Sequence, residues 1–454
     1  MLRARVLAPL SLVAVLASAC TRSEPDILLI SVDTLRRDHL SVYGYERDTT
    51  PRLRELADAG ATFELAYAPT ASTAPSHATL FTGLYPVAHG VVKNGIPLAE
   101  EFETLAESLA ERGYQTGGIV SSFVLKARFG FERGFTSYQD EFEPDTTSIF
   151  RESWGEFEVG GAFDRRAEYT TDLAIRWLRE QREPERPFFL FVHYMDPHSP
   201  YLAPGEHALH YVEAEADLDP QEQQRRLYDA EIAYTDAEIG RLLDALEETG
   251  LAGNTLVVVT ADHGEGLWDH GYQTHGVHLY EEEVRIPLLI RWPGRIIAGL
   301  RFPEPVELVD LKPTLLDLAE PPPRRPRAPA HGRSLAGALR ADEPLEAERP
   351  VFFHRRHYRH GTVEGITVSG ERFGLRWGRW KYIGPTHAEK PELYDLERDP
   401  GEHDNLAPAE PQIGAELADR LEAWRNAYGP SVRAPVPRIP AGDQRALEAL
   451  GYAE

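Results

Sequence analysis

Short runs of apolar residues recur along the chain, with longer stretches of helical periodicity between them. The apolar runs are DILLISV (26–32), QTGGIVSS (115–122), RPFFLFVHY (186–194), NTLVVVT (254–260) and IPLLIRWPG (286–294). An apolar run with almost no polar interruption is typical of a strand that is buried on both faces of a parallel sheet. The sequence therefore predicts at least five strands, and most of them should be parallel.

Helical periodicity predicts helices over 50–63, 104–113 and 228–250. The first has Thr50 as its cap, Pro51 in its first turn and Gly60 at its end. One face of the last helix collects the apolar residues Ile232, Ile239, Leu242, Leu243 and Leu246. Strands that alternate with helices predict an α/β fold, in which a mostly parallel central sheet is flanked by helices.

The pattern changes after 320–334, a stretch rich in Pro and Arg that predicts a connection. Beyond it, 373–384 predicts a β-hairpin, 392–407 a strand followed by a polar turn, and 411–428 a helix. Together these elements predict a small C-terminal α+β subdomain. The chain then divides into a main domain at 24–340, the C-terminal subdomain at 345–430 and a tail at 431–454.

The first 19 residues have the features of a targeting signal. MLRAR is basic, and VLAPLSLVAVLA is an apolar run too short and too early for an ordinary transmembrane helix. The run ends in ASAC, which resembles a bacterial lipoprotein signal with Cys20 as the lipidated N-terminus; a plain secretory signal is the alternative. Cys20 is the only cysteine, so an internal disulfide is excluded. We expect an exported protein, anchored to the membrane by its lipid alone and facing the periplasm or cell surface.

The formal net charge of −25 narrows the range of partners. A strongly acidic protein is repelled by the phosphate backbone, so we expect no binding to nucleic-acid duplexes. Its surface also disfavours anionic membranes. A small anionic substrate can still bind if a metal ion or a local basic pocket neutralises it.

Acidic and imidazole side chains follow three of the predicted strands. Asp33 comes directly after the first strand, Asp196 after the third, and Asp262 and His263 after the fourth. Ligands of open α/β sheets bind at this carboxyl edge. A single Asp there is more often a helix cap. The combination favours a metal site, because carboxylate oxygens and imidazole suit Zn²⁺, Mn²⁺, Ca²⁺ or Mg²⁺.

The stretch TASTAPSHATLFTGLYPVAHG (70–90) offers a nucleophile for such a site. The hydroxyl of Thr73 is a poor nucleophile at neutral pH, but coordination to a divalent ion lowers its pKa. The residues after Thr73 predict a helix, and a helix N-terminus favours an incoming phosphoryl or sulfuryl group.

Eight sequence blocks, taken in order, resemble those of the sulfatases and the wider alkaline phosphatase superfamily. They are LLISVDTLRRDHLSVYGY, TPRLRELADAGATFELAYAPT, APSHATLFTGLYP, MDPHSPY, TADHGE, LYEEEVRIPLLIRWPG, LVDLKPTLLDLA and ELYDLERDPGEHDNLA. The resemblance implies an alkaline phosphatase-like fold, with 24–340 as the catalytic domain. It also implies a hydrolase that acts on sulfate or phosphate esters.

The nucleophile motif departs from the sulfatase pattern. Sulfatases carry C/S-x-P-x-R, whose first residue is oxidised to formylglycine, but this chain has T-A-P-S-H. Threonine has the wrong skeleton for formylglycine, and His77 replaces the arginine. The motif instead resembles the nucleotide pyrophosphatase/phosphodiesterases, which use a threonine and two zinc ions. In that resemblance Asn94 orients the phosphate; its alternative role is that of a turn residue before Gly95.

The resemblance also implies a set of site residues. Metal ligands are Asp33, Thr73, Asp262 and His263 for one ion, and His275 and Asp196 for a second. His198 is either a further ligand or a contact to the ester group, and His77 assists catalysis. Sulfatases have a second Asp where this chain has Thr34, so a site with one ion is an alternative. The cofactor is a divalent metal, with Zn²⁺ or Mn²⁺ favoured over Ca²⁺.

We therefore expect a metal-dependent ester hydrolase, in which a metal-bound Thr73 attacks a phosphate mono- or diester in line. The substrate would be a small molecule or a glycan ester. One alternative is a sulfuric ester hydrolase, arylsulfatase-like, that acts on sulfated glycans. A phosphoglycol-type transferase and a non-catalytic lipoprotein that binds anions or glycans are further alternatives.

Overall fold

The computed structural model describes residues 24–143, 145–147, 153–154, 157–158, 162–212, 218–319, 330–341, 343–363 and 365–429. Its main sheet has the strand order β11-β2-β10-β8-β1-β7-β3-β4, with β9 paired to β2. These strands are β1 (Asp26–Val32), β2 (Ala61–Tyr67), β3 (Gln115–Ile119), β4 (Ser137–Gln139), β7 (Phe188–Tyr194), β8 (Thr255–Ala261), β9 (Arg285–Ile286), β10 (Leu288–Arg291) and β11 (Leu300–Glu307). The central strand β1 pairs in parallel with β7 and β8, and only β9 and β10 run antiparallel to their neighbours.

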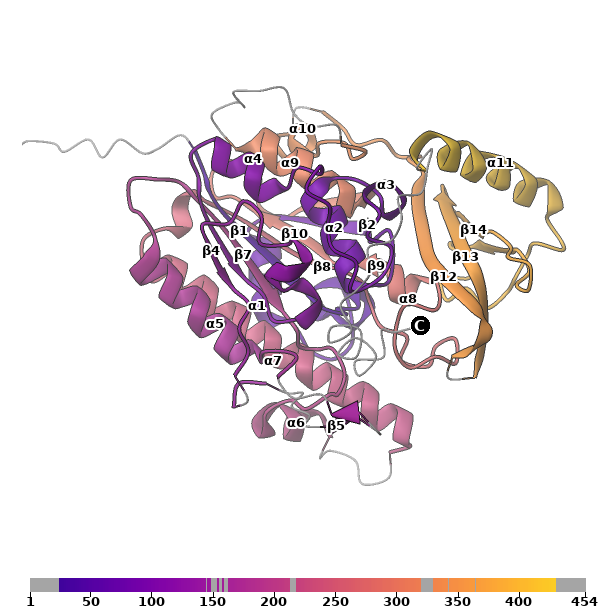
Figure 1. The fold of residues 1–454 in the computed structure, drawn as a ribbon, viewed down its shortest axis with the longest axis horizontal. Helices are drawn as coiled ribbons and strands as arrows, with labels where there is room; N and C mark the ends of the chain where they lie inside the picture. Colours follow the sequence, from indigo (N-terminus) through magenta and orange to yellow (C-terminus); the bar gives the residue numbers. More distant parts are fainter. Residues whose placement is uncertain are drawn as a thin grey trace, which may run out of the picture.

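Helices cover both faces of this sheet (Figure 1). One face carries α1 (Pro51–Asp58), α5 (Ala167–Arg176) and α7 (Pro220–Glu248), and α6 (Gly205–Val212) packs on α7. The other carries α2 (Thr73–Thr82), α3 (Pro86–His89), α4 (Leu105–Glu111), α9 (Leu311–Leu318) and α10 (Ala336–Leu339). The short helix α8 (Glu281–Val284) precedes β9, and a two-stranded ribbon pairs β5 (Ser153–Trp154) with β6 (Phe157–Glu158).

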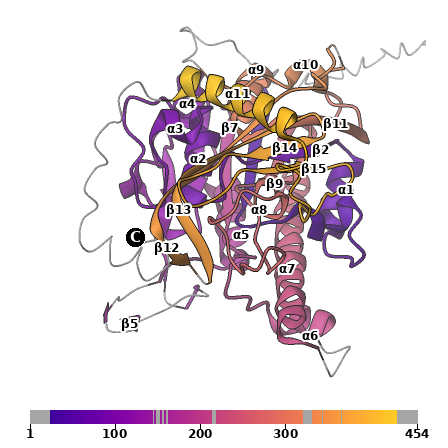
Figure 2. The same cartoon turned by 90° about the vertical axis from the view of Figure 1, so that its right-hand side faces the viewer.

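A second, antiparallel sheet lies beside the main domain in Figure 1 and in front of it in Figure 2. Its strand order is β12 (Val351–Val363), β13 (Ile366–Trp377), β14 (Trp380–Ile383) and β15 (Glu392–Asp395). The helix α11 (Pro411–Tyr428) covers it and buries Leu417, Leu421 and Trp424 against the apolar face of the sheet. The predicted hairpin is confirmed, because β13 and β14 pair through Trp377 and Trp380.

The predicted α/β class is confirmed, and each of the five predicted strands is present. The predicted end of one helix is wrong: the helix predicted over 50–63 stops at Asp58, and β2 begins at Ala61. A Cβ atom on Gly60 would lie 2.4 Å from the carbonyl oxygen of Ile290, so the chain passes close to β10 and continues as a strand. The sequence also did not show that β10 is antiparallel.

Some predictions concern residues outside the described ranges. These are the signal at 1–19, Cys20, the tail at 431–454 and most of the connection at 320–334. The predicted boundary near 340–345 falls between α10 and β12. None of the helices in the described part of the chain combines the length and the apolar character needed to cross a bilayer.

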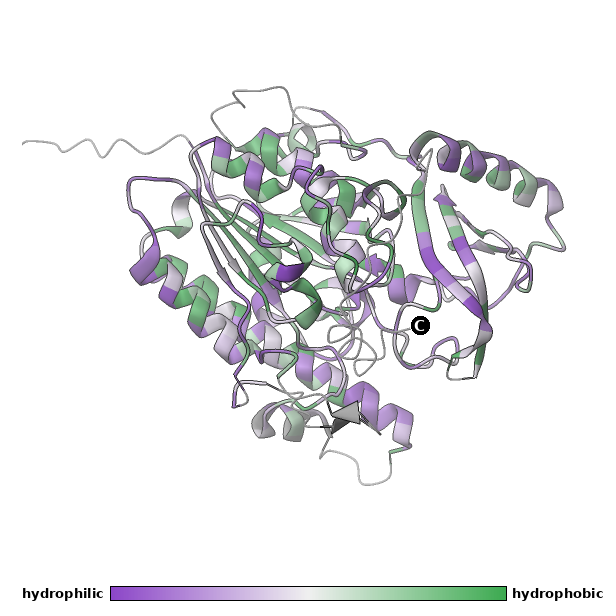
Figure 3. Ribbon diagram, in the orientation of Figure 1, coloured by the Kyte–Doolittle hydropathy of each residue, from purple (hydrophilic) through white to green (hydrophobic). Residues whose placement is uncertain are grey.

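The apolar residues concentrate in the main sheet and on the helix faces turned toward it (Figure 3). Every residue of β1, β7 and β8 is buried. Polar side chains are few in these strands: Asp26 and Thr255 begin β1 and β8, and the others lie toward the carboxyl ends. Ser31 on β1 and His193 on β7 are such cases, and they occupy paired positions.

Candidate active site and metal centre

Three predicted ligands meet at the carboxyl ends of β1 and β8. Asp33 follows β1, and Asp262 and His263 follow β8, whose last residue pairs with the last residue of β1. All three side chains are buried. The Nε2 atom of His263 lies 3.4 Å from Oδ2 of Asp262 and 3.8 Å from Oδ1 of Asp33. Their ligand atoms all lie within 4.8 Å of one another, a separation that one metal ion can bridge.

The carboxylates of this cluster are only partly satisfied by the protein. Oδ1 of Asp262 accepts from the backbone N–H groups of Thr34 and His263, at 3.2 and 2.9 Å. Oδ2 of Asp262 and both oxygens of Asp33 are buried and have no hydrogen-bond partner among the described residues. Burying unpaired carboxylate oxygens is costly unless a cation meets them. This donor set therefore fits a divalent metal ion.

Burial also changes how these two acids titrate. Burial, together with the charge of Asp33, raises the pKa of Asp262 to about 7. Burial raises the pKa of Asp33 as well, while His198 and His263 lower it. Both carboxyl groups must be deprotonated to bind a metal. A bound cation would stabilise their negative charges, which burial otherwise disfavours.

His263 is held in the tautomer that a metal ligand needs. Its Nδ1–H donates to the carbonyl of Gly264 at 2.9 Å, which leaves the lone pair of Nε2 directed toward the carboxylates. Burial, together with the nearby His275, lowers the pKa of His263 to about 4, so the ring is neutral at pH 7. The hydroxyl of Thr73 lies 3.4 Å from the same Nε2 atom.

Thr73 is fully buried and is the first residue of α2, as the sequence predicts. Asn94 fixes this helix start, because its Oδ1 accepts from the N–H of Ala74 at 2.8 Å. The Nδ2 group of Asn94 is buried with no partner among the described residues. Asn94 thus lies beside the nucleophile candidate with one amide donor still to be satisfied.

His77 supports Thr73 from one turn further along α2. Its Nδ1–H donates to the carbonyl of Thr73 at 2.8 Å, and its Nε2 accepts from the hydroxyl of Ser31 at 3.0 Å. Burial lowers the pKa of His77 to about 3. The ring is therefore neutral and does not bring the positive charge that an arginine would bring to this position. Its contacts are those of a positioning residue.

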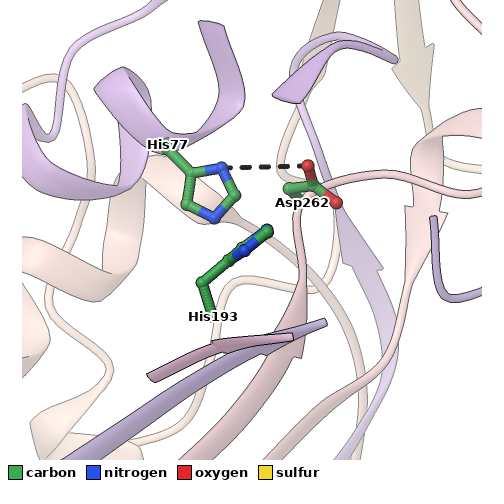
Figure 4. A group of neighbouring side chains, drawn as sticks. All are labelled: His77, His193 and Asp262. Carbon is green, nitrogen blue, oxygen red and sulfur yellow. Dashed lines mark ion pairs between the residues drawn. The ribbon is translucent and has the colours of Figure 1, made fainter. Parts of the chain in front are cut away.

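The structure adds His193, which sequence reasoning missed. It lies beside His77 and Asp262 (Figure 4), with its Nε2 at 3.5 Å from Oδ2 of Asp33. These three residues could also surround an ion. Both nitrogens of His77 are already bonded, however, so the group with Asp33, Asp262 and His263 offers the better donors. A histidine inside a run of buried strand residues was the available signal.

His275 and His198 lie on another side of the cluster. The ring of His275 is 4.4 Å from that of His263, and the ring of His198 is 5.2 Å from that of His275, measured between centroids. Nδ1 of His275 lies 3.1 Å from Oε1 of Glu265, a buried carboxyl that sequence reasoning also missed. Burial raises the pKa of Glu265 to about 7. The structure thus brings both predicted histidines to the site.

Asp196 has a different set of neighbours. Its Oδ2 accepts from the N–H of Ala167, the first residue of α5, at 2.7 Å. The side chain of Glu231 is its other close partner, and the two share a buried environment. These are the contacts of a helix cap, the alternative role of an Asp at a strand end. Its assignment to a second metal stays a prediction that these contacts do not favour.

The fold and this cluster define a metal-dependent ester hydrolase, and comparison with known proteins gives its family. The chain belongs to the sulfatase family: residues 25–321 match the family model described as Sulfatase. Residues 269–427 match a model described as N-sulphoglucosamine sulphohydrolase, C-terminal. Sulfatase-family enzymes use a divalent metal, which agrees with the donor set around Asp33.

One sequence relative and two solved structures of similar fold are given as examples. An arylsulfatase of Clostridium perfringens is 28% identical over 468 residues, which cover 88% of this chain and 93% of that protein. A structure solved with its substrate D-glucosamine-2-N,6-O-disulfate aligns with a TM-score of 0.75 at 22% identity, over 89% of this chain and 98% of the other. A phosphonate monoester hydrolase of Agrobacterium radiobacter aligns with a TM-score of 0.72 at 24% identity, over 89% and 96%.

Proposed function

We propose that this protein hydrolyses phosphate esters, with the hydroxyl of Thr73 as its nucleophile. The observation that carries the proposal is the position of Thr73. It starts α2, is fully buried, and lies 3.4 Å from the free nitrogen of His263. In sulfatases the residue at this place becomes formylglycine, and threonine cannot be converted to it.

The reaction has two displacements at phosphorus. In the first, Oγ1 of Thr73 bonds to phosphorus, and the substrate alcohol leaves with the electron pair of its P–O bond and takes up a proton. In the second, a water oxygen bonds to phosphorus, and Thr73 leaves and regains its proton. A divalent ion held by Asp33, Asp262 and His263 would supply Lewis acidity for both steps. The start of α2 and the Nδ2–H group of Asn94 would donate to the phosphoryl oxygens.

His77 contributes to this chemistry by positioning Thr73. Its hydrogen bonds join the carbonyl of Thr73 to Ser31 on the central strand β1. This link limits the movement of the nucleophile, and small displacements of a reacting atom reduce the rate strongly. A neutral His77 also leaves the charge of the oxyanion to be met by the other groups.

A sulfuric ester hydrolase is the second candidate. The identified family and the arylsulfatase relative favour it. A sulfated Thr73 would have to be cleaved by water at sulfur, because threonine lacks the second hydroxyl through which a formylglycine hydrate expels sulfate. We therefore expect sulfate turnover to be slower than phosphate turnover.

A paired assay distinguishes these candidates. Purified protein receives p-nitrophenyl phosphate, bis-p-nitrophenyl phosphate or p-nitrophenyl sulfate, with Zn²⁺, Mn²⁺ or Ca²⁺ added in turn, and Thr73→Ala is the control. Phosphate release that requires Thr73, with a phosphothreonine trapped by acid quench, supports the proposal. Faster sulfate release over many turnovers would contradict it. No turnover of any ester would favour a binding protein.

We further propose export and attachment to the membrane through a lipid on Cys20. The support is the N-terminal sequence, with its basic start and its apolar run that ends at the only cysteine. A Cys20→Ala variant expressed in a bacterial host should lose incorporated radiolabelled palmitate and leave the membrane fraction. Unchanged labelling would exclude Cys20 as the lipidation site.

A further inference from the structure

A basic stretch of β12 lies next to the candidate active site. The strand contains HRRHYRH (354–360), which has no acidic residue, in a chain with 73 acidic and 48 basic side chains apart from histidine. β12 forms the edge of the small sheet that faces the main domain (Figure 1). Such a concentration of positive charge in an acidic protein points to an anionic ligand.

Two contacts tie β12 to the loops of the site. The N–H of His354 donates to the carbonyl of Pro69 at 2.8 Å, four residues before Thr73. The hydroxyl of Tyr358 donates to the carbonyl of Gly276 at 3.0 Å, next to His275. Gly276 in turn lies against Ala71, since a Cβ atom on it would be 3.3 Å from the Ala71 carbonyl oxygen. The strand therefore runs along the loops that carry the nucleophile and His275.

The basic residues of this stretch have two different environments. Arg355 is buried and pairs with Glu389 at 2.7 Å, so it stabilises the small sheet. Arg356 is half-buried with its guanidinium 3.8 Å over the ring of Tyr358, and His357, Arg359 and His360 are exposed. Within the described ranges, neither Arg356 nor Arg359 forms an ion pair with a carboxylate. We call Arg356, His357, Arg359 and His360 the basic rim.

We propose that the basic rim binds a second anionic group of the substrate, which makes that substrate a polyanionic glycan ester. This inference rests on the proposed ester hydrolysis and names its substrate class. β12 is bulged here, because three of its residues oppose two of β13 both before and after Tyr358. A strand residue rises about 3.3 Å, so Arg356 and Arg359 are roughly 7 Å apart along β12. Two cations at such a spacing match anionic groups repeated along a chain, as in a sulfated or phosphorylated oligosaccharide. A substrate with a single charge would leave the rim unused.

Direct binding tests the rim without any need for turnover. The probes are dextran sulfate oligosaccharides and neutral dextran of the same length, titrated calorimetrically into the wild-type protein at two salt concentrations. Each of Arg356→Ala and Arg359→Ala should weaken dextran sulfate binding about threefold, and the double variant about tenfold. Higher salt should reduce the difference, because it screens exposed charges.

Arg179→Ala is the matched control. It removes one exposed arginine, which pairs with Glu248 at 2.6 Å near the opposite ends of the strands, and should leave binding unchanged. Thermal unfolding of each variant verifies the fold, and Arg356→Gln keeps part of the stem that packs on Tyr358. Equal affinity of the double variant and the wild type for dextran sulfate would overturn the proposal. Tighter binding of the rim to anionic vesicles or to duplex DNA than to dextran sulfate would also overturn the proposal.

The same variants separate this inference from the proposed function. If the protein hydrolyses p-nitrophenyl esters, about tenfold more dextran sulfate should be needed to halve the rate of the double variant than that of the wild type, each relative to its own uninhibited rate. If no ester is hydrolysed but dextran sulfate binds through Arg356 and Arg359, the proposed function is wrong and the anion-binding role of the rim is supported. If hydrolysis is normal and inhibition by dextran sulfate is unchanged in the variant, the rim fails alone.

Discussion

The molecule contains two clusters of fully buried acids that look alike in sequence and differ in their partners. At the carboxyl ends of β1 and β8, Asp33 and Asp262 face each other with three oxygen atoms that no described group satisfies. At the end of β11, Glu307 and Asp310 surround Arg349, whose guanidinium donates to Glu307 and to both oxygens of Asp310. The second cluster contains its own cation, and the first does not.

Titration alone would not separate the two clusters. Burial raises the pKa of Glu307 to about 7, although Arg349 acts to lower it. The pKa of Asp262 has the same value. The difference lies in the hydrogen bonds. Backbone N–H groups of Phe352 and Arg333 complete the shell around Glu307 and Asp310. A raised pKa therefore marks burial, whereas unsatisfied oxygens mark the place where a cation is needed.

The largest expected effect separates the clusters by activity. Thr73→Ala should reduce turnover at least about 10³-fold, because it removes the nucleophile, and Thr73→Ser should restore most of it. The matched change is Tyr85→Phe, which removes a hydroxyl that donates to Glu307 at 3.1 Å. That variant should keep its activity. The measurement is steady-state hydrolysis of p-nitrophenyl phosphate, and an active Thr73→Ala enzyme would contradict the assignment.

The next effect concerns stability at the arginine cluster. Arg349→Ala leaves Glu307 and Asp310 buried without their cation, and should lower the free energy of unfolding by about 3 to 5 kcal/mol. Urea unfolding measures it. Added Zn²⁺ or Mn²⁺ should not restore the loss, since the backbone donors leave no room for a full metal shell. A loss below about 1 kcal/mol would show that the two clusters are not different in kind.

Replacing Asp262 or Asp310 by uncharged Asn should change the free energy of unfolding in opposite directions. In metal-free protein, Asp262→Asn removes the repulsion with Asp33 and should raise the free energy of unfolding by about 1 kcal/mol. Asp310→Asn removes the partner of Arg349 and should lower it by about 2 kcal/mol. The stabilisation by added metal should vanish only in Asp262→Asn. Equal signs for the two variants in urea unfolding would refute the comparison.

The pH dependence follows from the raised pKa of Asp262. A carboxyl with a pKa of 3.8 when unfolded and about 7 when folded holds its proton longer in the folded state. Metal-free protein should therefore lose stability as pH rises from about 4 to about 7. A divalent metal binds the deprotonated acids, so its increase in melting temperature should be larger at pH 8 than at pH 5. Calorimetric scans with and without metal measure this, and an equal increase at both pH values would exclude Asp262 as a ligand.

The smallest effect concerns backbone strain. Thr34, next to Asp33, has a φ of 54°, which is unfavourable for a β-branched residue, and its buried hydroxyl has no partner among the described residues. Thr34→Gly should raise the stability of the metal-free protein by about 0.5 to 1 kcal/mol. Thr235→Gly, within α7, should lower it by about 1 kcal/mol. A loss of stability in both variants would show that Thr34 is not strained.

The amino-acid sequence alone predicts the fold class and the grouping of Asp33, Asp262 and His263. Apolar runs are local patterns, and each one became a strand because burial on both faces requires such a run. The position of Asp33, Asp262 and His263 followed from the same patterns, since parallel strands end at one edge of a sheet. The helix that begins at Thr73 was also predicted, because the proposed nucleophile and the helix start are neighbours in the chain.

The partners of each side chain follow from the tertiary structure and not from local sequence. His193 comes beside His77 because β7 and β1 pair with His193 opposite Ser31. Asp196 and Asp33 both follow buried strands, yet α5 begins against Asp196, while nothing described satisfies Asp33. The cation of the Glu307 cluster comes from Arg349, in the loop before β12. β12 itself contacts the loop of His275 through the Tyr358 hydroxyl and the Gly276 carbonyl. Contacts of this kind join segments that are distant in the chain, so no local pattern contains them.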